Sequence, residues 1–436
     1  MNKTLKETRE MKDSGIGWIG EIPQEWELAP LKAILKERKE KNLPIKTTNI
    51  LSLTIDKGVI PYSEKSGGGN KAKEDLTAYK LAYPNDIVLN SMNVIAGSVG
   101  LSKYFGAISP VYYTLYTNEY RNHISYFNNI FQTQAFQKSL MGLGNGIMIK
   151  ESGSGKLNTI RLRISMEKLK GVMLPVPPLH EQQVIANYLD EQVEKIDGLI
   201  SEQKQAIEKW KEYKQSLITE TVTQGLNPNV EMKDSGIEWI GKIPNEWSIN
   251  RGKFILKLLK RPIKESDEVI TCFRDGEVTL RSNRREDGFT FSLKEIGYQG
   301  IEPDDLVIHG MDGFAGAIGI SDSRGKGSPV LNVCDALFGC KKYYMYYLRT
   351  LAINNVFLAL ATGIRERSCD LRWNKVANLE FVIPPFLEQQ AITEFLDEKC
   401  LKIDQTIEQK EMLINHLEEY KQSLIYECVT GKRCVL

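Results

Sequence analysis

The strongest constraint on this chain is that it contains the same segments twice. Residues 11–26 read MKDSGIGWIGEIPQEW and residues 232–247 read MKDSGIEWIGKIPNEW, with 13 of 16 positions identical. Self-similarity on this scale is typical of a duplicated structural unit, so we predict two copies of one unit, each about half of the chain. A second set of blocks repeats later in each copy: EQQ at 181–183 and 388–390, KID at 195–197 and 402–404, and EYKQSLI at 212–218 and 419–425.

Two long inserts lie between the repeated segments, and they share little sequence until they are aligned on one motif. Pro84 to Leu89 aligns with Pro303 to Ile308, and this match fixes the alignment of the inserts. Short apolar runs bounded by Gly, Pro and Asn predict several strands in mixed α/β domains; in the first insert they are Asp86 to Leu89, Val111 to Tyr116 and Gly171 to Leu174. The predicted parts are 1–26, the first repeat segment; 27–178, the first insert; 179–226, a central helix; 227–247, a linker with the second repeat segment; 248–385, the second insert; and 386–436, a C-terminal helix.

Each insert is followed by a segment that is predicted to form one long helix. Gln182 to Thr223 contains no Pro and only one Gly, and its apolar residues recur at alternating spacings of three and four, which predicts a helix of about 60 Å. Two seams of equal length favour pairing with each other, although helices that lie on a globular core are an alternative. The seams contain Ile185, Leu189, Val193, Ile196, Ile200, Ile207, Trp210 and Leu217, and then Ile392, Leu396, Cys400, Ile403, Ile407, Ile414, Leu417 and Leu424.

The formal net charge of +1 hides an uneven distribution along the chain. Residues 27–178 carry 20 Lys and Arg against 11 Asp and Glu, and residues 248–385 carry 20 against 17. The helical segments are acidic, with 5 against 9 in residues 179–226 and 6 against 10 in residues 386–436. An anionic partner is therefore expected at the inserts.

Signals for catalysis are weak. Gly153 to Leu157 resembles the end of a phosphate-binding loop, but Leu157 replaces the required Ser or Thr. Pro303-Asp304-Asp305 could belong to a nuclease motif, but a turn before a strand explains it and its counterpart Pro84-Asn85-Asp86 equally well. The four His have no zinc spacing, and the seven Cys form no CxxC pair, so we expect free thiols and no catalytic, cofactor or metal site.

The layout as a whole resembles the specificity subunit of a type I restriction-modification system. The resemblance rests on WIGEIP at 18–23 and WIGKIP at 239–244, on PPLHEQQ at 177–183 and PPFLEQQ at 384–390, and on the two EYKQSLI helix ends. It covers the whole chain. It implies an α+β fold in which two mixed α/β target recognition domains are separated by two long antiparallel coiled-coil helices, with an internal pseudo-two-fold repeat.

The resemblance also implies a function and a set of partners. Each target recognition domain is expected to read one half of a bipartite, asymmetric site in double-stranded DNA. The helices are expected to set the half-site spacing and to dock two modification subunits, while separate restriction subunits cleave. S-adenosylmethionine, and ATP with Mg for cleavage, are expected on those partners, so this chain is predicted to be a non-catalytic, cytoplasmic subunit without a membrane segment. Docking and coiled-coil contacts are expected at the seam residues and at Gln182 and Gln389.

Candidate DNA contacts are the residues that differ between matched insert segments, together with the basic clusters. Asn, Ser and Arg side chains can read base edges, and Lys can contact phosphate. A solvated loop residue is the alternative at each position. The candidates are Lys65, Asn70, Lys71, Lys73, Asn90, Ser91, Asn93, Lys103, Tyr104, Arg161 and Arg163 in the first insert, and Arg281, Asn283, Arg284, Arg285, His309, Asp312, Arg324, Lys326, Arg365, Arg367 and Arg372 in the second.

Two other functions compete with DNA recognition. A self-contained DNA nuclease or methyltransferase would act on DNA without partner subunits. A coiled-coil scaffold would bind proteins only and would show no salt-dependent DNA affinity.

Overall fold

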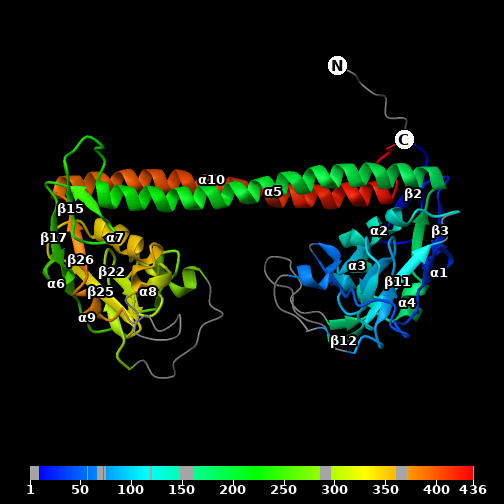
Figure 1. The fold of residues 1–436 in the computed structure, drawn as a ribbon, viewed down its shortest axis with the longest axis horizontal. Coiled ribbons are helices and arrows are strands. Elements are labelled where there is room, and N and C mark those ends of the chain that lie inside the picture. The colour runs from blue at the N-terminus through cyan, green and yellow to red at the C-terminus, as the bar shows by residue number, and fades with distance from the viewer. Residues whose placement is uncertain are drawn as a thin grey trace, which may run out of the picture. The chain divides into compact units, whose positions relative to one another are not determined.

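The structure is a computed structural model that describes residues 9–55, 57–65, 72, 75–117, 120–147, 161–284, 296–359 and 371–435. The chain forms two compact units (Figure 1). Unit 1 consists of Met1–Glu202 and Met412–Leu436, and unit 2 consists of Gln203–Glu411. No helix of the described residues is both long and apolar enough to cross a membrane.

Unit 1 contains short strands, short helices and parts of two long helices. Its elements are β1 (Met11–Asp13), β2 (Glu21–Pro23), β3 (Glu27–Pro30), α1 (Leu31–Ile34), β4 (Leu35–Glu37), β5 (Leu51–Thr54), β6 (Gly58–Pro61), η1 (Tyr62–Glu64), β7 (Lys80–Ala82), β8 (Ile87–Asn90), η2 (Val94–Ala96), β9 (Val99–Leu101), β10 (Gly106–Ile108), β11 (Tyr112–Thr117), α2 (Ile124–Gln132), α3 (Gln134–Ser139), η3 (Leu140–Leu143), β12 (Asn145–Ile147), β13 (Arg161–Arg163), α4 (Met166–Lys170), β14 (Met173–Val176) and the first part of α5 (Leu179–Gln224).

Unit 2 repeats most of this order. Its elements are β15 (Met232–Asp234), β16 (Lys242–Pro244), β17 (Ser248–Arg251), α6 (Gly252–Ile255), β18 (Leu256–Leu258), β19 (Ile270–Cys272), β20 (Val278–Leu280), η4 (Arg281–Asn283), β21 (Gln299–Ile301), β22 (Leu306–His309), η5 (Gly313–Ala315), β23 (Ile318–Ile320), β24 (Gly325–Gly327), β25 (Leu331–Ala336), α7 (Lys341–Ile353), α8 (Val356–Ala359), α9 (Trp373–Val376), β26 (Glu380–Ile383) and the first part of α10 (Phe386–Val429).

The two inserts have the same sheet topology. An antiparallel four-stranded sheet has the order β4-β11-β8-β9 in unit 1 and β18-β25-β22-β23 in unit 2. The register also matches, because Tyr112 pairs with Asn90 and Leu331 pairs with His309, and these two pairs are equivalent in the alignment of the inserts. The predicted strands near residues 86, 111 and 171 are confirmed as β8, β11 and β14, with ends shifted by one or two residues.

Both long helices begin where the sequence predicts, and α5 also ends close to its predicted end, whereas α10 ends at Val429, before the predicted 436. Proline lacks a backbone N–H group and disfavours a helical conformation of the residue before it, so a helix rarely extends through a Pro-Pro pair. Both α5 and α10 begin at the residue that follows such a pair. Gly225 follows the last residue of α5 with a φ of 79°, a left-handed conformation that glycine adopts readily and that commonly terminates helices.

Within each unit, segments of the two helices run in opposite directions. In unit 2, the Lys410 ammonium donates to Gln203 Oε1 at 3.0 Å, and Lys214 Nζ lies 2.6 Å from Asp404 Oδ2, so rising numbers in α5 meet falling numbers in α10. In unit 1, Lys421 Nζ lies 2.6 Å from Asp197 Oδ1, which is the same contact between the equivalent residues of the repeated blocks. Most apolar seam residues are buried; Val193, Trp210, Leu217, Ile407 and Leu417 are half-buried.

Buried tyrosines attach each insert to the helices. The Tyr126 hydroxyl of α2 donates to the Val429 carbonyl at 2.9 Å, and the Tyr343 hydroxyl of α7 donates to the Val222 carbonyl at 3.0 Å. Both rings are fully buried, so each hydroxyl needs a partner. The core of each insert is thereby continuous with the end of a long helix.

Candidate nucleic-acid interface

The motifs repeated between the halves bind one another inside each unit. The Trp26 indole N–H donates to Glu181 Oε2 at 2.9 Å in unit 1, and the Trp247 indole N–H donates to Glu388 Oε2 at 2.9 Å in unit 2. The first residue of each EQQ block therefore holds the tryptophan of the other repeated motif. This contact explains why the two blocks occur together although they lie far apart in the chain.

The next residue of each EQQ block ties the start of a long helix to its insert. Gln182 Oε1 accepts the His123 backbone N–H at 2.8 Å, and Gln389 Oε1 accepts the Cys340 backbone N–H at 2.8 Å. The two amide nitrogens donate to the carbonyls of Pro177 and Pro384, and both side chains are buried. These glutamines serve attachment within their own unit, which leaves them no surface for docking another subunit.

Unit 1 has a cleft of about 590 Å³ on one side of its insert. Its walls come from β5 and the turn after it, from η1, from the end of β8 and the turn that follows, and from the start of β11. The lining is largely uncharged, with amide, hydroxyl and aromatic groups beside a single described cation, Lys65. The residues that line it are Ile50, Leu51, Ser52, Leu53, Thr54, Ile55, Tyr62, Lys65, Ala72, Tyr79, Asn90, Met92, Asn93, Ser98, Ser109, Val111 and Tyr112.

Unit 2 has a cleft of about 870 Å³ in the same place. Every residue that lines it aligns with a residue that lines the first cleft, except Asp275. The walls here are strongly charged, with three arginines and two aspartates. The residues are Val269, Ile270, Thr271, Cys272, Phe273, Arg274, Asp275, Arg281, Arg284, His309, Asp312, Ser328 and Leu331.

Asn90 and His309 occupy equivalent places at the ends of β8 and β22. Asn90 Oδ1 accepts the Met92 backbone N–H at 3.0 Å, and His309 Nδ1 accepts the backbone N–H groups of Met311 and Asp312 at 3.2 and 2.9 Å. Burial lowers the pKa of His309, and an accepting Nδ1 places the proton of the neutral ring on Nε2. The turn that follows each strand therefore fixes the side chain through its acceptor atom. The Asn90 amide nitrogen and the His309 Nε2–H can still donate a hydrogen bond to a ligand.

The comparisons with known proteins agree with this organisation. Residues 23–209 match the type I restriction modification DNA specificity domain. Over 95% of its length the chain is 23% identical to the putative type I restriction enzyme MjaX specificity subunit of Methanocaldococcus jannaschii, covering 95% of that protein. It is 21% identical, also over 95% of its length, to the StySPI specificity subunit of Salmonella potsdam, of which it covers 90%.

The chain is thus similar, over nearly its whole length, to specificity subunits of type I restriction-modification systems. A solved chain from a study of assembly and conformational transition of the type I system has the same fold, with a TM-score of 0.64 and 12% identity over 94% of this chain and 99% of that one.

The basic cluster after β20 lies at the rim of the second cleft. Arg284 forms ion pairs with Asp275 and Glu277, and its guanidinium lies 4.2 Å from the Phe273 ring centroid. Nε of Arg281 donates to Thr271 Oγ1 at 3.3 Å, and Nδ2 of Asn283 donates to Thr279 Oγ1 at 2.9 Å. Arg281 and Arg284 line the cleft, as Tyr62 and Lys65 do in unit 1.

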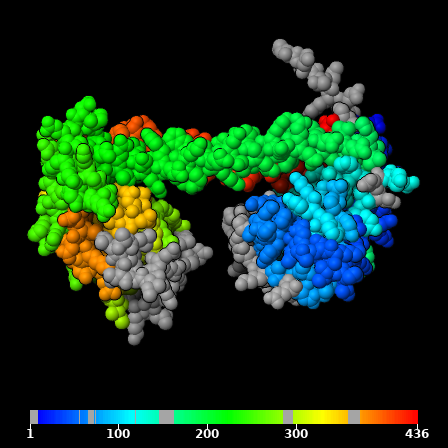
Figure 2. All heavy atoms as spheres, viewed as in Figure 1, coloured from blue at the N-terminus to red at the C-terminus, as the bar shows by residue number. Residues whose placement is uncertain are grey.

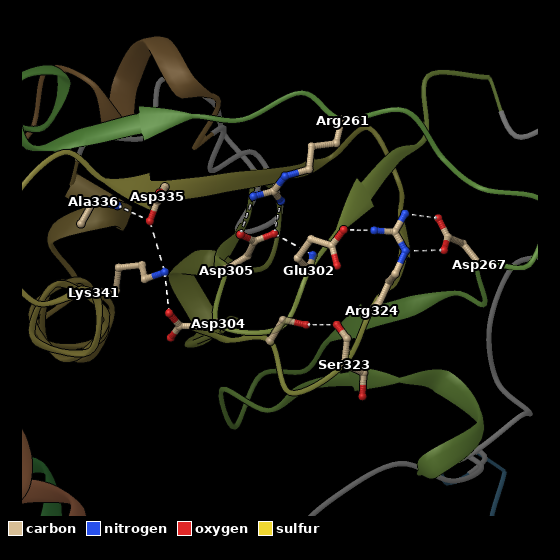
Figure 3. A network of polar contacts seen from close by, with 11 residues as sticks. Arg261, Asp267, Glu302, Asp304, Asp305, Ser323, Arg324, Asp335, Ala336 and Lys341 are labelled. Carbon is tan, nitrogen blue, oxygen red and sulfur yellow. Dashed lines mark hydrogen bonds and ion pairs between the residues drawn. The ribbon is translucent and has the colours of Figure 1, made fainter.

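Two of the predicted DNA contacts, Arg324 and Ser91, bind other residues of this chain instead. Figure 3 shows Arg324 between Asp267, whose Oδ1 lies 3.0 Å from the guanidinium, and Glu302, with which it also forms an ion pair. This network fixes the loop between β23 and β24 and argues against a base contact for Arg324. Ser91 is buried, and its hydroxyl donates to the Val111 carbonyl at 3.0 Å, which likewise argues against base reading.

The acidic turns before β8 and β22 are structural, as the turn interpretation predicts. Asp86 accepts the Tyr83 backbone N–H at 2.9 Å, and Asp305 accepts the Glu302 backbone N–H at 2.7 Å. Each carboxylate is also held by two nitrogens of one arginine, Arg38 or Arg261, as Figure 3 shows for Arg261. Among the described residues, no cluster of three or more His, Cys, Asp or Glu could hold a metal ion.

Apart from Lys65, the remaining candidates lie outside the two clefts or outside the described residues. Lys103, Tyr104, Arg163 and Arg372 are exposed, and Lys326 is half-buried on β24. Lys65 lines the first cleft, with its ammonium 5.7 Å from the Tyr62 ring centroid. Asn70, Lys71, Lys73, Arg285, Arg365 and Arg367, and the side chain of Arg161, lie outside the described residues.

Several cleft residues were not predicted from the sequence. Ile55, Tyr62 and Arg274 line the clefts, and none was among the candidates. The alignment of the two inserts does extend back to Ile50 without a gap, but few identities mark it there. Extending the alignment beyond its visible identities would have found these positions.

Proposed function

We propose that the two clefts are the DNA-reading surfaces of two target recognition domains, each of which reads one half of a bipartite, asymmetric site. One observation carries the proposal: two inserts with the same topology have a cleft in the same place, lined at equivalent positions by different side chains. A shared fold with different reading groups is what recognition of two unlike half-sites requires.

The charge distribution supports DNA as the ligand. The basic charge of the chain is concentrated in residues 27–178 and 248–385, which contain the clefts, whereas the helical segments are acidic. Lysine and arginine near the cleft rims provide phosphate contacts that position the duplex, and the polar groups inside provide contacts to base edges. Lys65 and Arg284 occupy equivalent rim positions for the phosphate role.

We also propose that α5 and α10 form an antiparallel coiled coil that sets the half-site spacing. The ion pairs of Lys214 with Asp404 and of Lys421 with Asp197 join equivalent residues of the repeated blocks, and this repetition supports a pseudo-two-fold arrangement. Polar residues in a seam fix its register at some cost in stability. The domains would follow the predicted boundaries, with inserts at 27–178 and 248–385.

The helices would also dock two modification subunits. Figure 2 shows α5, in green, with its surface exposed on the side that faces the viewer. In unit 2, Ala206, Lys209, Trp210 and Tyr213 line an open, mainly apolar hollow of about 420 Å³ on α5. Aromatic residues at a surface hollow are typical anchors of protein interfaces. Restriction subunits would join in the full complex.

The specificity subunit would have no catalytic role. In this proposal, S-adenosylmethionine binds to the modification subunits, and ATP with Mg acts in the restriction subunits. The residues singled out for a nucleotide loop and a nuclease motif support no such site here, because Asp305 serves a strand-entry turn and Leu157 lacks the required hydroxyl.

Sequencing of DNA methylated by the reconstituted complex tests the proposal. The chain is purified with its cognate modification subunits and S-adenosylmethionine, and methylated adenines are mapped in unmodified DNA. We expect a bipartite motif, of which one half changes when residues 27–178 are replaced by the insert of a relative. Methylation by the purified chain alone, or DNA binding with neither sequence preference nor salt dependence, would contradict it.

A further inference from the structure

Two equivalent positions at each cleft carry different side chains in the two units, and each pair of side chains is complementary to a different DNA base pair. In unit 2, Arg274 in the turn after β19 and Asp312 before η5 both line the cleft, and Arg274 Nη2 lies 2.8 Å from Asp312 Oδ1. The equivalent positions of unit 1 in the alignment of the inserts are Ile55 and Asn93, and both line the first cleft. The two positions therefore lie across the same corner of each cleft.

The backbone holds one member of each pair in the same way. The Asp312 carbonyl accepts the N–H groups of Ala315 and Ala317 at 2.9 and 3.2 Å. The Asn93 carbonyl accepts those of Ala96 and Ser98 at 3.0 and 3.1 Å. Both turns close through a glycine with positive φ, at Gly97 and Gly316. The backbone at positions 93 and 312 is therefore fixed in the same conformation in both units. A fixed backbone reduces the conformational entropy that is lost when the side chain binds a ligand.

The side chains at these positions are available to a ligand. Ile55 is 63% exposed, although a large aliphatic side chain gains free energy from burial. The Arg274 and Asp312 side chains are 59% and 35% exposed. An ion pair this open contributes little to stability, so it can exchange its internal contact for contacts with DNA at small cost.

The chemistry of each pair fits a different base pair in the major groove. Arginine donates to O6 and N7 of guanine, and a carboxylate accepts from N4 of cytosine. Asparagine forms two hydrogen bonds with adenine, and an apolar side chain contacts the thymine methyl group. Position 312 or 93 would thus face the base that carries its exocyclic amino group in the major groove, cytosine or adenine.

We propose that these two positions read one base pair in each half-site: Arg274 and Asp312 read a G·C pair, and Ile55 and Asn93 read an A·T pair. The inference rests on the proposed function of the clefts and names their specificity-determining residues. His309 and Asn90, each one turn away with a fixed N–H donor, would contact a neighbouring base.

Exchanging the pairs between the units tests the assignment. One variant carries Arg274→Ile with Asp312→Asn, and the reciprocal variant carries Ile55→Arg with Asn93→Asp. Each is assembled with the cognate modification subunits and S-adenosylmethionine, and methylated adenines are mapped in a random-sequence plasmid library. We expect the first variant to change one base pair of one half-site from G·C to A·T, and the reciprocal variant to make the opposite change in the other half-site, each by about 10-fold or more in relative methylation.

The controls separate this inference from the proposed function. Glu167→Gln, at an exposed ion pair on α4, is expected to retain the wild-type motif. If the wild-type complex shows a bipartite motif and both exchanged variants retain it unchanged, the assignment of these residues is wrong while the proposed function stands. If the wild-type complex has no bipartite motif, the proposed function itself fails.

A variant that no longer methylates is tested by binding. Competition between labelled target DNA and duplexes with each single base-pair change shows which position has lost discrimination. Loss of discrimination at a single base pair, by about 10-fold or more, supports the assignment. Equal losses at every position, or none at any, contradict it.

Discussion

The attachment of the helices and the walls of the clefts differ in how strictly the two units repeat. Trp26 with Glu181 and Trp247 with Glu388 make the same hydrogen bond at 2.9 Å, and Gln182 and Gln389 accept equivalent backbone N–H groups at 2.8 Å. The cleft walls keep their backbone but exchange almost every polar group. The two copies have thus kept the same contacts that hold a unit together, whereas the side chains that line the clefts differ between them.

One asymmetry occurs within the shared attachment itself. In unit 1, Arg9 also binds Glu181, with Nη2 donating to Oε2 at 2.7 Å, and its guanidinium lies 5.6 Å from the Trp26 ring centroid. Position 230, the corresponding residue of unit 2, is Val. The glutamate of unit 1 is therefore paired with a cation, whereas Glu388 is held by the indole and has valine at the position equivalent to this arginine.

The largest expected effect tests whether the attachment is equivalent in the two units. Trp26→Ala and Trp247→Ala each remove a fully buried side chain, so each is expected to destabilise its unit by about 3–5 kcal/mol. Calorimetric unfolding measures the loss. A normal melting temperature for either variant would show that its tryptophan is not part of a packed core.

The arginine asymmetry predicts unequal responses to matched substitutions. Glu181→Gln removes one of the two carboxylates that pair with Arg9, the other being that of Glu25, and is expected to cost about 2–3 kcal/mol. Glu388→Gln changes one hydrogen bond and is expected to cost about 1 kcal/mol. Chemical denaturation of the two variants compares the losses, and Arg9→Met combined with Glu181→Gln is expected to recover part of the first. Equal losses would contradict the asymmetry.

The helix ion pairs predict small and equal effects. Lys214→Ala and Lys421→Ala each remove a partly exposed pair with aspartate, so each is expected to cost about 0.2–1 kcal/mol, less at high salt. Thermal melts at low and high ionic strength measure the loss of stability and its dependence on salt. A loss confined to one variant would argue against equivalent helix contacts in the two units.

His309 predicts a pH dependence that is specific to unit 2 and smaller still. Burial lowers its pKa in the folded chain, so below about pH 6.5 the unfolded state binds a proton that the folded state resists. Stability is therefore expected to fall as the pH decreases through this range. His309→Asn, which installs the residue of unit 1, is expected to reduce this pH dependence of the melting temperature. An unchanged dependence would assign it to other groups.

The sequence predicted the repeated parts well because repetition and helix periodicity are local signals. Pro178 and Gly225 marked the start and end of α5 to within a few residues, and the seam positions were visible from spacing alone. The partners of the repeated motifs were not predictable, since the contact of Trp26 with Glu181 joins residues far apart in the chain.

The cleft was predicted less completely because its walls combine distant turns. Asn93 and His309 were found from differences between aligned segments, but Arg274 and Ile55 lie in a hairpin turn with almost no identity to guide alignment. Arg324 looked like a DNA contact because a sequence shows the charge of an arginine but not the carboxylates of Asp267 and Glu302 that neutralise it.

A chain with the second insert in both positions tests the central claim most directly. Residues 27–178 are replaced by residues 248–385, and the complex with modification subunits is used to map methylated adenines. If each insert reads one half-site and the units are related by a pseudo-two-fold axis, the motif becomes an inverted repeat of the half-site that unit 2 reads. An active complex that retains the wild-type asymmetric motif would contradict the account.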